Sequence, residues 1–198
     1  MNFFINGEKI NVSLENEKTA GDIFKSFAAI CEENSAAVTQ IKINGNIISC
    51  NDFDEVSKND LHENDIFEFN IISKEELKNA LSKISENFKT LEERMKVIPM
   101  DLQCGKIKES LCAIKDLADC IGEFCHIATL SNLFPEITVK KINNLSLNDF
   151  FKEFSPILED FEQALKSNDT VTVGDLSEYE ICPRLLDISK SSEELICH

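Results

Sequence analysis

The cysteines and histidines of this chain are the residues whose grouping first suggests a metal site. The 198 residues include eight cysteines and three histidines, and one segment collects several of them: Cys104, Cys112, Cys120, Cys125 and His126. Zinc sites use ligand pairs two to four residues apart on a turn, but these cysteines are separated by five or eight residues of predicted helix. At 1.5 Å per residue, Cys104 and Cys125 lie roughly 30 Å apart along the axis. We therefore predict no metal ligands and no cofactor, and interpret Cys104, Cys120 and Cys125 as small apolar side chains on the two apolar stripes of this segment. Cys112 lies off both stripes, and we expect it to be the first thiol to react with a labelling reagent.

The segment Glu123-Phe124-Cys125-His126 has the Glu-x-x-His spacing of di-iron sites in helical bundles. Such a site needs two of these motifs and two further glutamates, all facing the interior. This chain has one motif, and its apolar pattern places Glu123 on the outward face and His126 beside the polar side. We predict that this pair does not bind iron.

Catalysis by a nucleophile, a histidine and an acid has few possible participants. The histidines are His62 in a charged turn, His126 and His198. The chain contains neither Gly-x-Ser-x-Gly nor a glycine-rich phosphate loop. The carboxylates Asp175, Glu178 and Glu180 gather near Tyr179, but Glu180 has the i,i+4 spacing of an ordinary helical ion pair with Arg184. We predict no catalytic residues and a protein that is not an enzyme.

The elements that carry these residues are predicted helices, in which apolar residues alternate spacings of three and four. Ser73 is the predicted cap of the first helix, with Glu76 completing a capping box, and Pro99 is its predicted end. Ser146 and Asp149 are the predicted cap of the third. The three apolar runs are Leu77, Leu81, Ile84, Phe88, Leu91, Met95 and Ile98; Cys104, Ile107, Leu111, Ile114, Ala118, Ile121, Cys125 and Ala128; and Leu147, Phe151, Phe154, Leu158, Phe161 and Leu165.

These three runs predict helices that cross one another at a small angle. A fourth, less regular helical segment is predicted over about 171–190. Short connections near 99–103 and 168–170 make neighbouring helices antiparallel. Pro156 either kinks the third helix or, with Ser155 as cap, starts a new one. The second helix has a further apolar stripe, which predicts that it is the most buried helix and leaves homodimer formation open as an alternative. This stripe consists of Ala113, Leu117, Cys120, Phe124 and Ile127.

The first seventy residues have a different pattern. Two Asn-Gly pairs, Asn6-Gly7 and Asn44-Gly45, lie between short apolar runs and predict tight hairpins. Thr19, with Asp22 three residues later, is the predicted cap of a helix between the hairpins. A last strand covers 66–72 and runs directly into the first long helix. The order strand, strand, helix, short strands and final strand predicts a β-grasp, so the fold class is α+β, with a β-grasp (ubiquitin-like) domain over 1–73 and an antiparallel four-helix bundle over 74–198.

Residues 2–72 resemble the ubiquitin-like sulfur carriers of thiamine and molybdopterin synthesis. The matching features are the early Asn-Gly hairpin, the helix start Thr-Ala-Gly-Asp, the segment Ile-Asn-Gly-Asn-Ile, and a turn at Asn64-Asp65 where the carriers have Gly-Asp. The resemblance implies a left-handed Asn64 and a carrier that works through a free Gly-Gly terminus. Here Ser73-Lys74-Glu75 and a long helical part follow, and no glycine pair occurs. The resemblance therefore implies the fold and not the activity.

Composition limits the partners. Acidic residues outnumber basic ones 36 to 20, a net charge of −16, which argues against nucleic acid and anionic membrane surfaces. No basic segment followed by an apolar run opens the chain, and no apolar run approaches the ~18 residues of a membrane span. With free thiols expected, these features predict a cytoplasmic protein.

We expect a non-enzymatic cytoplasmic adaptor whose partner is another protein. One alternative is a chaperone, because the helical part resembles small acidic bundles that chaperone exported flagellar or secretion subunits; its open apolar groove would lie where the fourth segment packs. Another is a small-molecule-binding protein or an enzyme with a pocket between the two domains, which an inward-facing polar cluster around Glu178 would favour.

Overall fold

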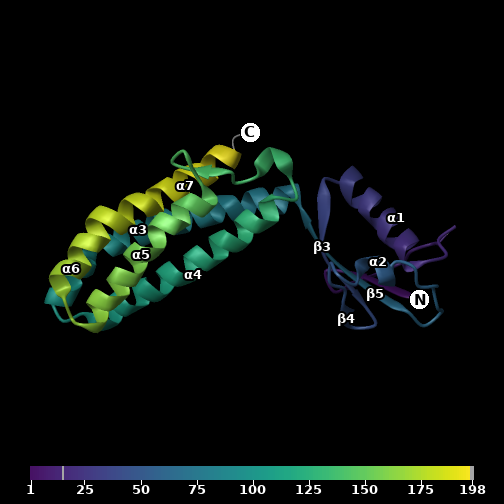
Figure 1. Cartoon of the computed structure of the whole chain (residues 1–198), viewed down its shortest axis with the longest axis horizontal. Helices are drawn as coiled ribbons and strands as arrows, with labels where there is room; N and C mark the ends of the chain where they lie inside the picture. Colours follow the sequence, from purple (N-terminus) through teal and green to yellow (C-terminus); the bar gives the residue numbers. More distant parts are fainter. Residues whose placement is uncertain (15, 197–198) are drawn as a thin grey trace. The chain divides into compact units, whose positions relative to one another are not determined.

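The computed structural model describes residues 1–14 and 16–196, and the chain divides into two compact units. The first unit is Met1–Glu76, and the second begins at Leu77. The first contains a five-stranded sheet and the second is mostly helical, so the fold is of the α+β class. Figure 1 shows the elements of both units along the chain.

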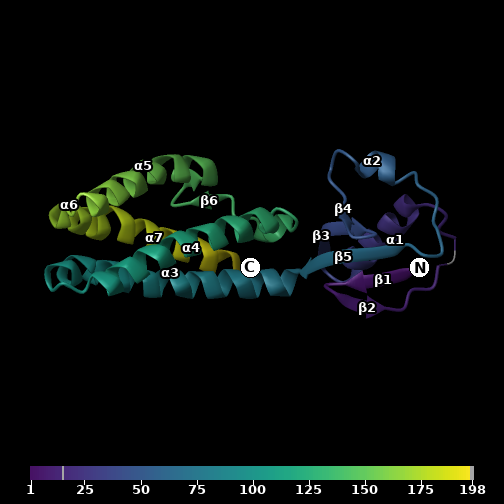
Figure 2. The same ribbon diagram turned by 90° about the horizontal axis from the view of Figure 1, so that it is seen from below.

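The sheet of the first unit has the strand order β2-β1-β5-β3-β4. Its elements are β1 (Asn2–Ile5), β2 (Glu8–Ile10), α1 (Ala20–Glu33), β3 (Ala36–Ile43), β4 (Asn46–Ile47), the short α2 (Phe53–Val56) and β5 (Ile66–Ser73). The first and last strands, β1 and β5, pair in parallel, and the other pairs are antiparallel. Figure 2 shows β5 between β1 and β3.

Stacked phenylalanines form the core between α1 and the sheet. Phe27 of α1 stacks on Phe69 of β5 with ring centroids 4.0 Å apart, and Phe3 of β1 stacks on Phe67 at 5.4 Å. All four are buried. Alternate residues of a strand face one side of a sheet, so Phe67 and Phe69 both reach α1.

Both predicted hairpin turns are confirmed, because Asn6, Gly7, Asn44 and Gly45 all have positive φ. The Asn44 amide oxygen also accepts from the N–H of Ile66 at 2.9 Å, so this turn also holds the start of β5. The predicted capping box of α1 is present at Thr19 and Asp22. Asn64 is not among the described residues with positive φ, so the left-handed turn implied by the sulfur carriers is wrong there.

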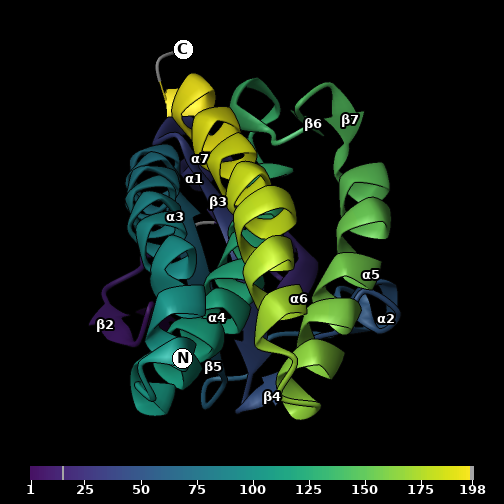
Figure 3. The ribbon, with the colours of Figure 1, turned by 90° about the vertical axis from the view of Figure 1, so that its left-hand side faces the viewer.

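The second unit has long helices that lie side by side (Figure 3). Its elements are α3 (Lys74–Gln103, which starts in the first unit), α4 (Ile107–Ser131), the 3₁₀ turn η1 (Pro135–Ile137), the hairpin β6 (Lys141–Ile142) and β7 (Leu145–Ser146), α5 (Leu147–Lys166), α6 (Thr170–Asp175), the π-helical segment η2 (Leu176–Ile181) and α7 (Cys182–Ile196). The caps predicted for α3 and α5 are confirmed: Ser73 accepts from the Glu76 N–H and Ser146 from the Asp149 N–H, both at 3.1 Å.

The first predicted apolar run is confirmed, since all seven of its residues in α3 are buried. In the third run Phe154 and Phe161 are buried, and Leu147, Phe151, Leu158 and Leu165 are half-buried. Pro156 lies inside one continuous α5. The predicted end of α3 at Pro99 is wrong, because the helix continues through this proline to Gln103.

The predicted register of α4 is wrong. In the predicted run Leu111, Ala118 and Cys125 are exposed, Ile114 and Ile121 are half-buried and Ala128 is buried. The side chain of Ile107 lies outside the described part. The other stripe forms the core contact: Ala113, Leu117, Phe124 and Ile127 are buried, and the Phe124 ring is 5.9 Å from Phe88 of α3. Phenylalanine is the largest side chain on either stripe, and its burial orients the helix.

Candidate functional site

The interpretation of Cys104, Cys120 and Cys125 as apolar packing residues is wrong for Cys104 and Cys125. Cys104, Cys112 and Cys125 are exposed and Cys120 is half-buried. Within residues 1–14 and 16–196, no group of three or more histidine, cysteine or acidic side chains is placed to hold a metal ion. Cys182, which the sequence did not single out, is buried in the second unit, and burial raises the pKa of its thiol to about 11. Its Sγ lies 3.5 Å from the Glu92 carbonyl oxygen, as a weak donor between helices.

The other candidate side chains lie apart on the surface. Glu123 and His126 are both exposed on α4. The His62 ring is also exposed, with Nδ1 3.5 Å from an Asp65 carboxylate oxygen. His198 and Cys197 lie outside the described residues. Of the two described histidines, His62 lies in the first unit and His126 in the second.

The carboxylates of the fourth segment face outward. Glu178 and Asp175 are exposed, and Tyr179 is 66% exposed. Glu180 accepts from Arg184 at 2.7 Å, the predicted i,i+4 pair, and the Arg184 guanidinium lies 5.9 Å from the centre of the Phe154 ring. The inward polar cluster around Glu178 that would favour an enzyme is therefore not formed.

The inner face of the same segment is closed by small residues. A Cβ on Gly174 would come within 3.2 Å of the Pro99 ring, and Ser177 is fully buried with its hydroxyl 2.7 Å from the Met95 carbonyl oxygen. Because Gly174 and Ser177 are small, α6 and η2 can approach α3 this closely. An open groove, expected here for a chaperone, is absent along the contact of Gly174 and Ser177 with α3.

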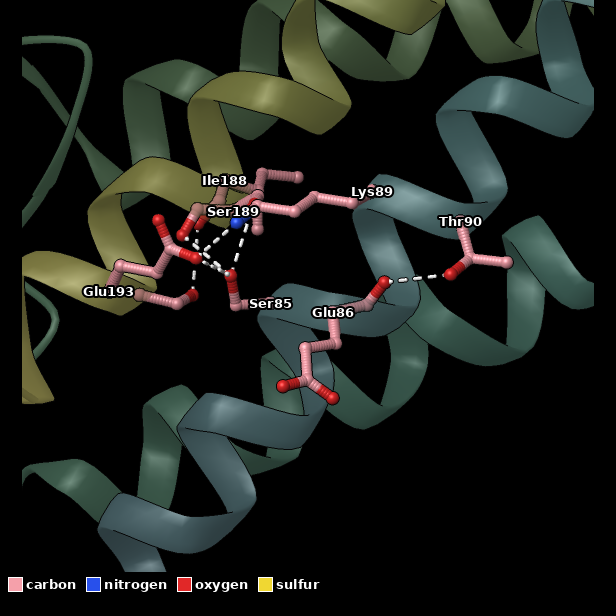
Figure 4. A network of polar contacts seen from close by, with 8 residues as sticks. Ser85, Glu86, Lys89, Thr90, Ile188, Ser189 and Glu193 are labelled. Atoms are coloured by element: carbon pink, nitrogen blue, oxygen red, sulfur yellow. Dashed lines mark hydrogen bonds and ion pairs between the residues drawn. The ribbon is translucent and has the colours of Figure 1, made fainter.

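A polar network between Ser85 of α3 and Ser189 of α7 joins these two helices (Figure 4). The Ser85 and Ser189 hydroxyls are 2.8 Å apart, and Ser85 also lies within hydrogen-bonding distance of Glu193, which pairs with Lys89. Both serines are buried. Because these polar atoms satisfy one another, we interpret the network as a structural contact that fixes the register of the two helices.

An unpaired strand edge lies in the first unit. β3 spans eight residues, but β4 pairs only with Lys42 and Ile43. The Ile48 N–H adds a bond to the Ile41 carbonyl, so the outer edge of Ala36–Gln40 has no neighbouring strand among residues 1–14 and 16–196. A cavity of about 390 Å³ lies beside this edge and is lined by Val38, Thr39, Gln40, Ile41, Ile48, Ser49, Cys50 and Phe53. Sequence reasoning missed this site, although the shortness of the run after Asn44-Gly45 was a usable signal.

A second open surface is the outward apolar face of α4. Leu111 is 57% exposed, Ala118 and Cys125 are exposed, and Ile114 and Ile121 are half-buried at its margin. None of the described helices combines the length and the apolar content required to cross a membrane.

Comparison with known proteins divides the chain at nearly the same place as the structure. The family described as TP0873 N-terminal domain matches residues 1–73, and the family described as Domain of unknown function (DUF8042) matches residues 79–191. An uncharacterized protein of Treponema pallidum (strain Nichols) is 26% identical over 189 residues, which cover 96% of this chain and 94% of that protein. No solved structure matches the chain. Because the DUF8042 match spans more than half of the 198 residues, the protein belongs to the DUF8042 family.

Proposed function

We propose that this protein is a non-enzymatic cytoplasmic adaptor, in which a β-grasp domain binds a segment of another protein and an antiparallel four-helix bundle follows it. The observation that carries the proposal is the unpaired edge of β3 over Ala36–Gln40. The β-grasp assignment is supported by the parallel pairing of β1 with β5, the antiparallel hairpins on either side and the packing of α1 on one face.

The chain beyond β5 supports a role other than sulfur transfer. Ser73 and Glu76 exchange hydrogen bonds of 2.7 Å and 3.1 Å across the first turn of α3. A carrier needs a flexible tail with a terminal carboxyl group, and a capped helix at this position provides neither.

The edge of β3 differs from the other edges of this sheet. Proteins protect exposed edges by making them short or by placing charges on them. β2 has three residues, including Glu8 and Lys9, and β4 has two. By contrast, Ala36–Gln40 carries no charge and no proline. An extended peptide can add to such an edge through main-chain hydrogen bonds and place alternate side chains beside it. The pairing of β3 with β5 is irregular between Val38 and Gln40, and such a bulge partly protects the edge, so we expect a bound peptide to pair in two short segments on either side of Thr39.

The cavity beside the edge defines the chemistry of the peptide. Ile48 and Phe53 provide apolar contacts, and Phe53 is 39% exposed. Asp52, Asp54 and Glu55 flank Phe53 in the sequence, and residues 1–73 hold 13 acidic and five basic residues. We therefore expect the bound segment to be extended, with alternating apolar residues and an adjacent lysine or arginine.

The test is selection of peptides from a displayed library of the native proteome, with the full chain as bait. Enriched peptides are then titrated into ¹⁵N-labelled protein. Strand addition predicts that amides of Ala36–Gln40 shift and become protected from hydrogen exchange. Thr39→Lys, which places a long charged side chain at this exposed position, should weaken binding at least tenfold. Glu8→Lys on the β2 edge is the matched control and should bind slightly more weakly or equally.

Two outcomes would contradict the proposal. One is enrichment of peptides that bind wild type and Thr39→Lys equally while the β3 amides remain unprotected. The other is enrichment of amphipathic helical segments that shift α4 resonances, which would favour the chaperone alternative.

A further inference from the structure

The main-chain groups of β3 that face its open edge can be identified from the pairing on the other side of the strand. Residues opposite each other in an antiparallel pair alternate between exchanging two main-chain hydrogen bonds and exchanging none. The Ser35 carbonyl accepts from the Lys74 N–H at 2.8 Å, so the main chain of Ser35 is directed toward the end of β5. Ala36, the next residue in the same register, therefore directs its N–H and C=O groups to the open side, and Val38 does the same.

The residues of β5 opposite these two positions have the same alternation. Ile71 lies opposite Val38, and its N–H and C=O groups bond to the side chain of Asn6 at 2.9 Å and 3.2 Å instead of to β3. Ser73 lies opposite Ala36, and its N–H donates within the first turn of α3 at 2.7 Å. Among residues 1–14 and 16–196, no strand pairs with Ala36 or Val38 on the open side. The edge therefore offers the donor and the acceptor of both residues to another chain.

The side chains at this edge face α1. Val38 packs against the core cluster between α1 and the sheet, and Ile41, beyond the irregularity, does so too. Both residues line the cavity of about 390 Å³ together with Phe53, whose ring is stacked on Phe24 of α1 with centroids 5.3 Å apart. The cavity therefore lies on the α1 face of the edge. A strand added to β3 places the residue opposite Val38 on this same face.

Negative charge gathers at the other end of the free segment. α1 ends with Glu32 and Glu33, directly before the turn into β3, and both side chains are exposed. The last turn of α1 contains no basic residue, and the C-terminal end of a helix has a partial negative charge. Lys74 contributes one positive charge at this end of the sheet. A basic side chain opposite Ala36 would therefore have complementary charges beside it.

Given strand addition at the β3 edge, which is the function proposed above, we propose that the bound segment contains an apolar residue, then any residue, then lysine or arginine. The segment runs antiparallel to β3, because parallel pairing is less stable per residue and only Ala36 and Val38 offer free groups. The apolar residue pairs with Val38 and its side chain enters the cavity beside Phe53. The basic residue pairs with Ala36 and lies near Glu33. The residue between them faces the other side of the sheet, away from the cavity.

A peptide array tests the motif. Peptides of the form Thr-Thr-X-Thr-Z-Thr-Thr, with X and Z each varied over all amino acids, are probed with the labelled full chain. Binding should favour leucine, isoleucine, methionine or phenylalanine at X and lysine or arginine at Z. Exchange of X and Z should weaken binding at least fivefold, and a preference for the exchanged order would overturn the antiparallel arrangement. An array without binding peptides would overturn the motif.

Hydrogen exchange of the full chain tests the pairing. In the free protein the amides of Ala36 and Val38 should exchange quickly, whereas the amide of Ala37, directed toward β5, should be protected. The best peptide of the array, or a peptide from the proteome library, should slow exchange at Ala36 and Val38 at least tenfold and leave Ala37 nearly unchanged. Protection of β3 without this alternation would overturn the assignment of the free groups and leave strand addition in place. Absence of any protection in β3 would overturn the proposed function itself.

Two exposed positions provide variants that test the two selected side chains. Glu33→Lys should change the preferred residue at Z from lysine or arginine to aspartate or glutamate, a change that lost stability would not produce. Glu8→Lys on β2 is the matched control and should keep the wild-type preference. Phe53→Ala should weaken binding of peptides with an apolar X at least fivefold and leave the preference at Z unchanged. If Glu33→Lys keeps the wild-type preference or Phe53→Ala keeps the wild-type affinity, the motif is overturned even where the β3 amides are protected.

Discussion

The hydroxyl of Ser177 donates a 2.7 Å hydrogen bond to the carbonyl oxygen of Met95, four residues before Pro99. Proline has no N–H, so a proline inside a helix leaves this carbonyl without its usual partner. Ser177 lies in η2, and its fully buried side chain reaches the Met95 carbonyl of α3. The chain tolerates Pro99 within α3 because a residue almost eighty positions later replaces the missing donor.

Ser177→Ala should therefore destabilise the protein by about 1–3 kcal/mol, since it leaves a buried carbonyl unsatisfied. Pro99→Ala restores the helical N–H, so Ser177→Ala should cost clearly less in that background. Urea unfolding of the four proteins of this double-mutant cycle measures the coupling. Additive effects would contradict the replacement of the missing donor by Ser177.

Gly174 depends on the same proline. An alanine Cβ at this position would lie 3.2 Å from both Cβ and Cγ of Pro99. We expect Gly174→Ala to lower the free energy of unfolding although alanine favours helices. In the Pro99→Ala background the ring is gone, and Gly174→Ala should become neutral or stabilising. A stabilising effect in the wild-type background would show that α3 and α6 are less tightly packed than the structure indicates.

The contact between Met95 and Ser177 also shows where sequence reasoning stops. The spacing of apolar residues in α3 predicted its buried face, because seven residues repeat in one register. Pro99 led to the prediction that α3 ends there. This prediction failed because the donor that replaces the missing N–H, Ser177, is distant in sequence. In α4 two stripes have the same spacing, and periodicity cannot decide which one meets the core. The size of Phe124 was the signal for the correct choice.

The candidate sites also depend on contacts that local sequence spacing does not determine. Glu123 is exposed, but the register of α4 from which its outward position was predicted is wrong, so the agreement does not come from the periodicity. The open edge of β3 depends on how many residues β4 pairs, which is a property of the pairing register. An uncovered surface such as this edge can be identified only when the tertiary structure shows which elements pack beside it.

The polar network between α3 and α7 predicts a difference between two buried serines. Ser85 bonds across to Ser189, while Ser192 bonds only to Ile188 of its own helix. Ser85→Ala should cost about 1–2 kcal/mol because it leaves the buried Ser189 hydroxyl without its partner across the helices. Ser192→Ala is the matched control and should cost clearly less. Equal losses in chemical denaturation would show that the cross-helix bond does not contribute.

Glu193 should make the stability of this contact depend on pH. The hydrogen bond from Lys89 holds the pKa of the Glu193 carboxyl below its ordinary 4.5 in the folded protein. The stabilisation is therefore complete above about pH 4.5 and is lost as the pH falls through the lowered folded value. Glu193→Gln should remove a small part of the acid dependence of unfolding, with little change at pH 7 because the pair is largely exposed. An acid profile identical to that of wild type would exclude this role.

Thiol reactivity tests the placement of Cys182 against that of the exposed cysteines. A buried thiol whose pKa is raised to about 11 is almost entirely protonated at pH 8, and the thiolate is the reactive form. Cys112, which the sequence predicts to react first, is exposed on α4, and Cys50 and Cys104 are exposed as well. Brief maleimide labelling followed by peptide mass spectrometry should modify these three sites and leave Cys182 unmodified until urea unfolds the second unit. Rapid labelling of Cys182 in the folded protein would mean that α7 separates from α3 on that timescale, and the close packing at Gly174 and Ser177 would then have to be transient.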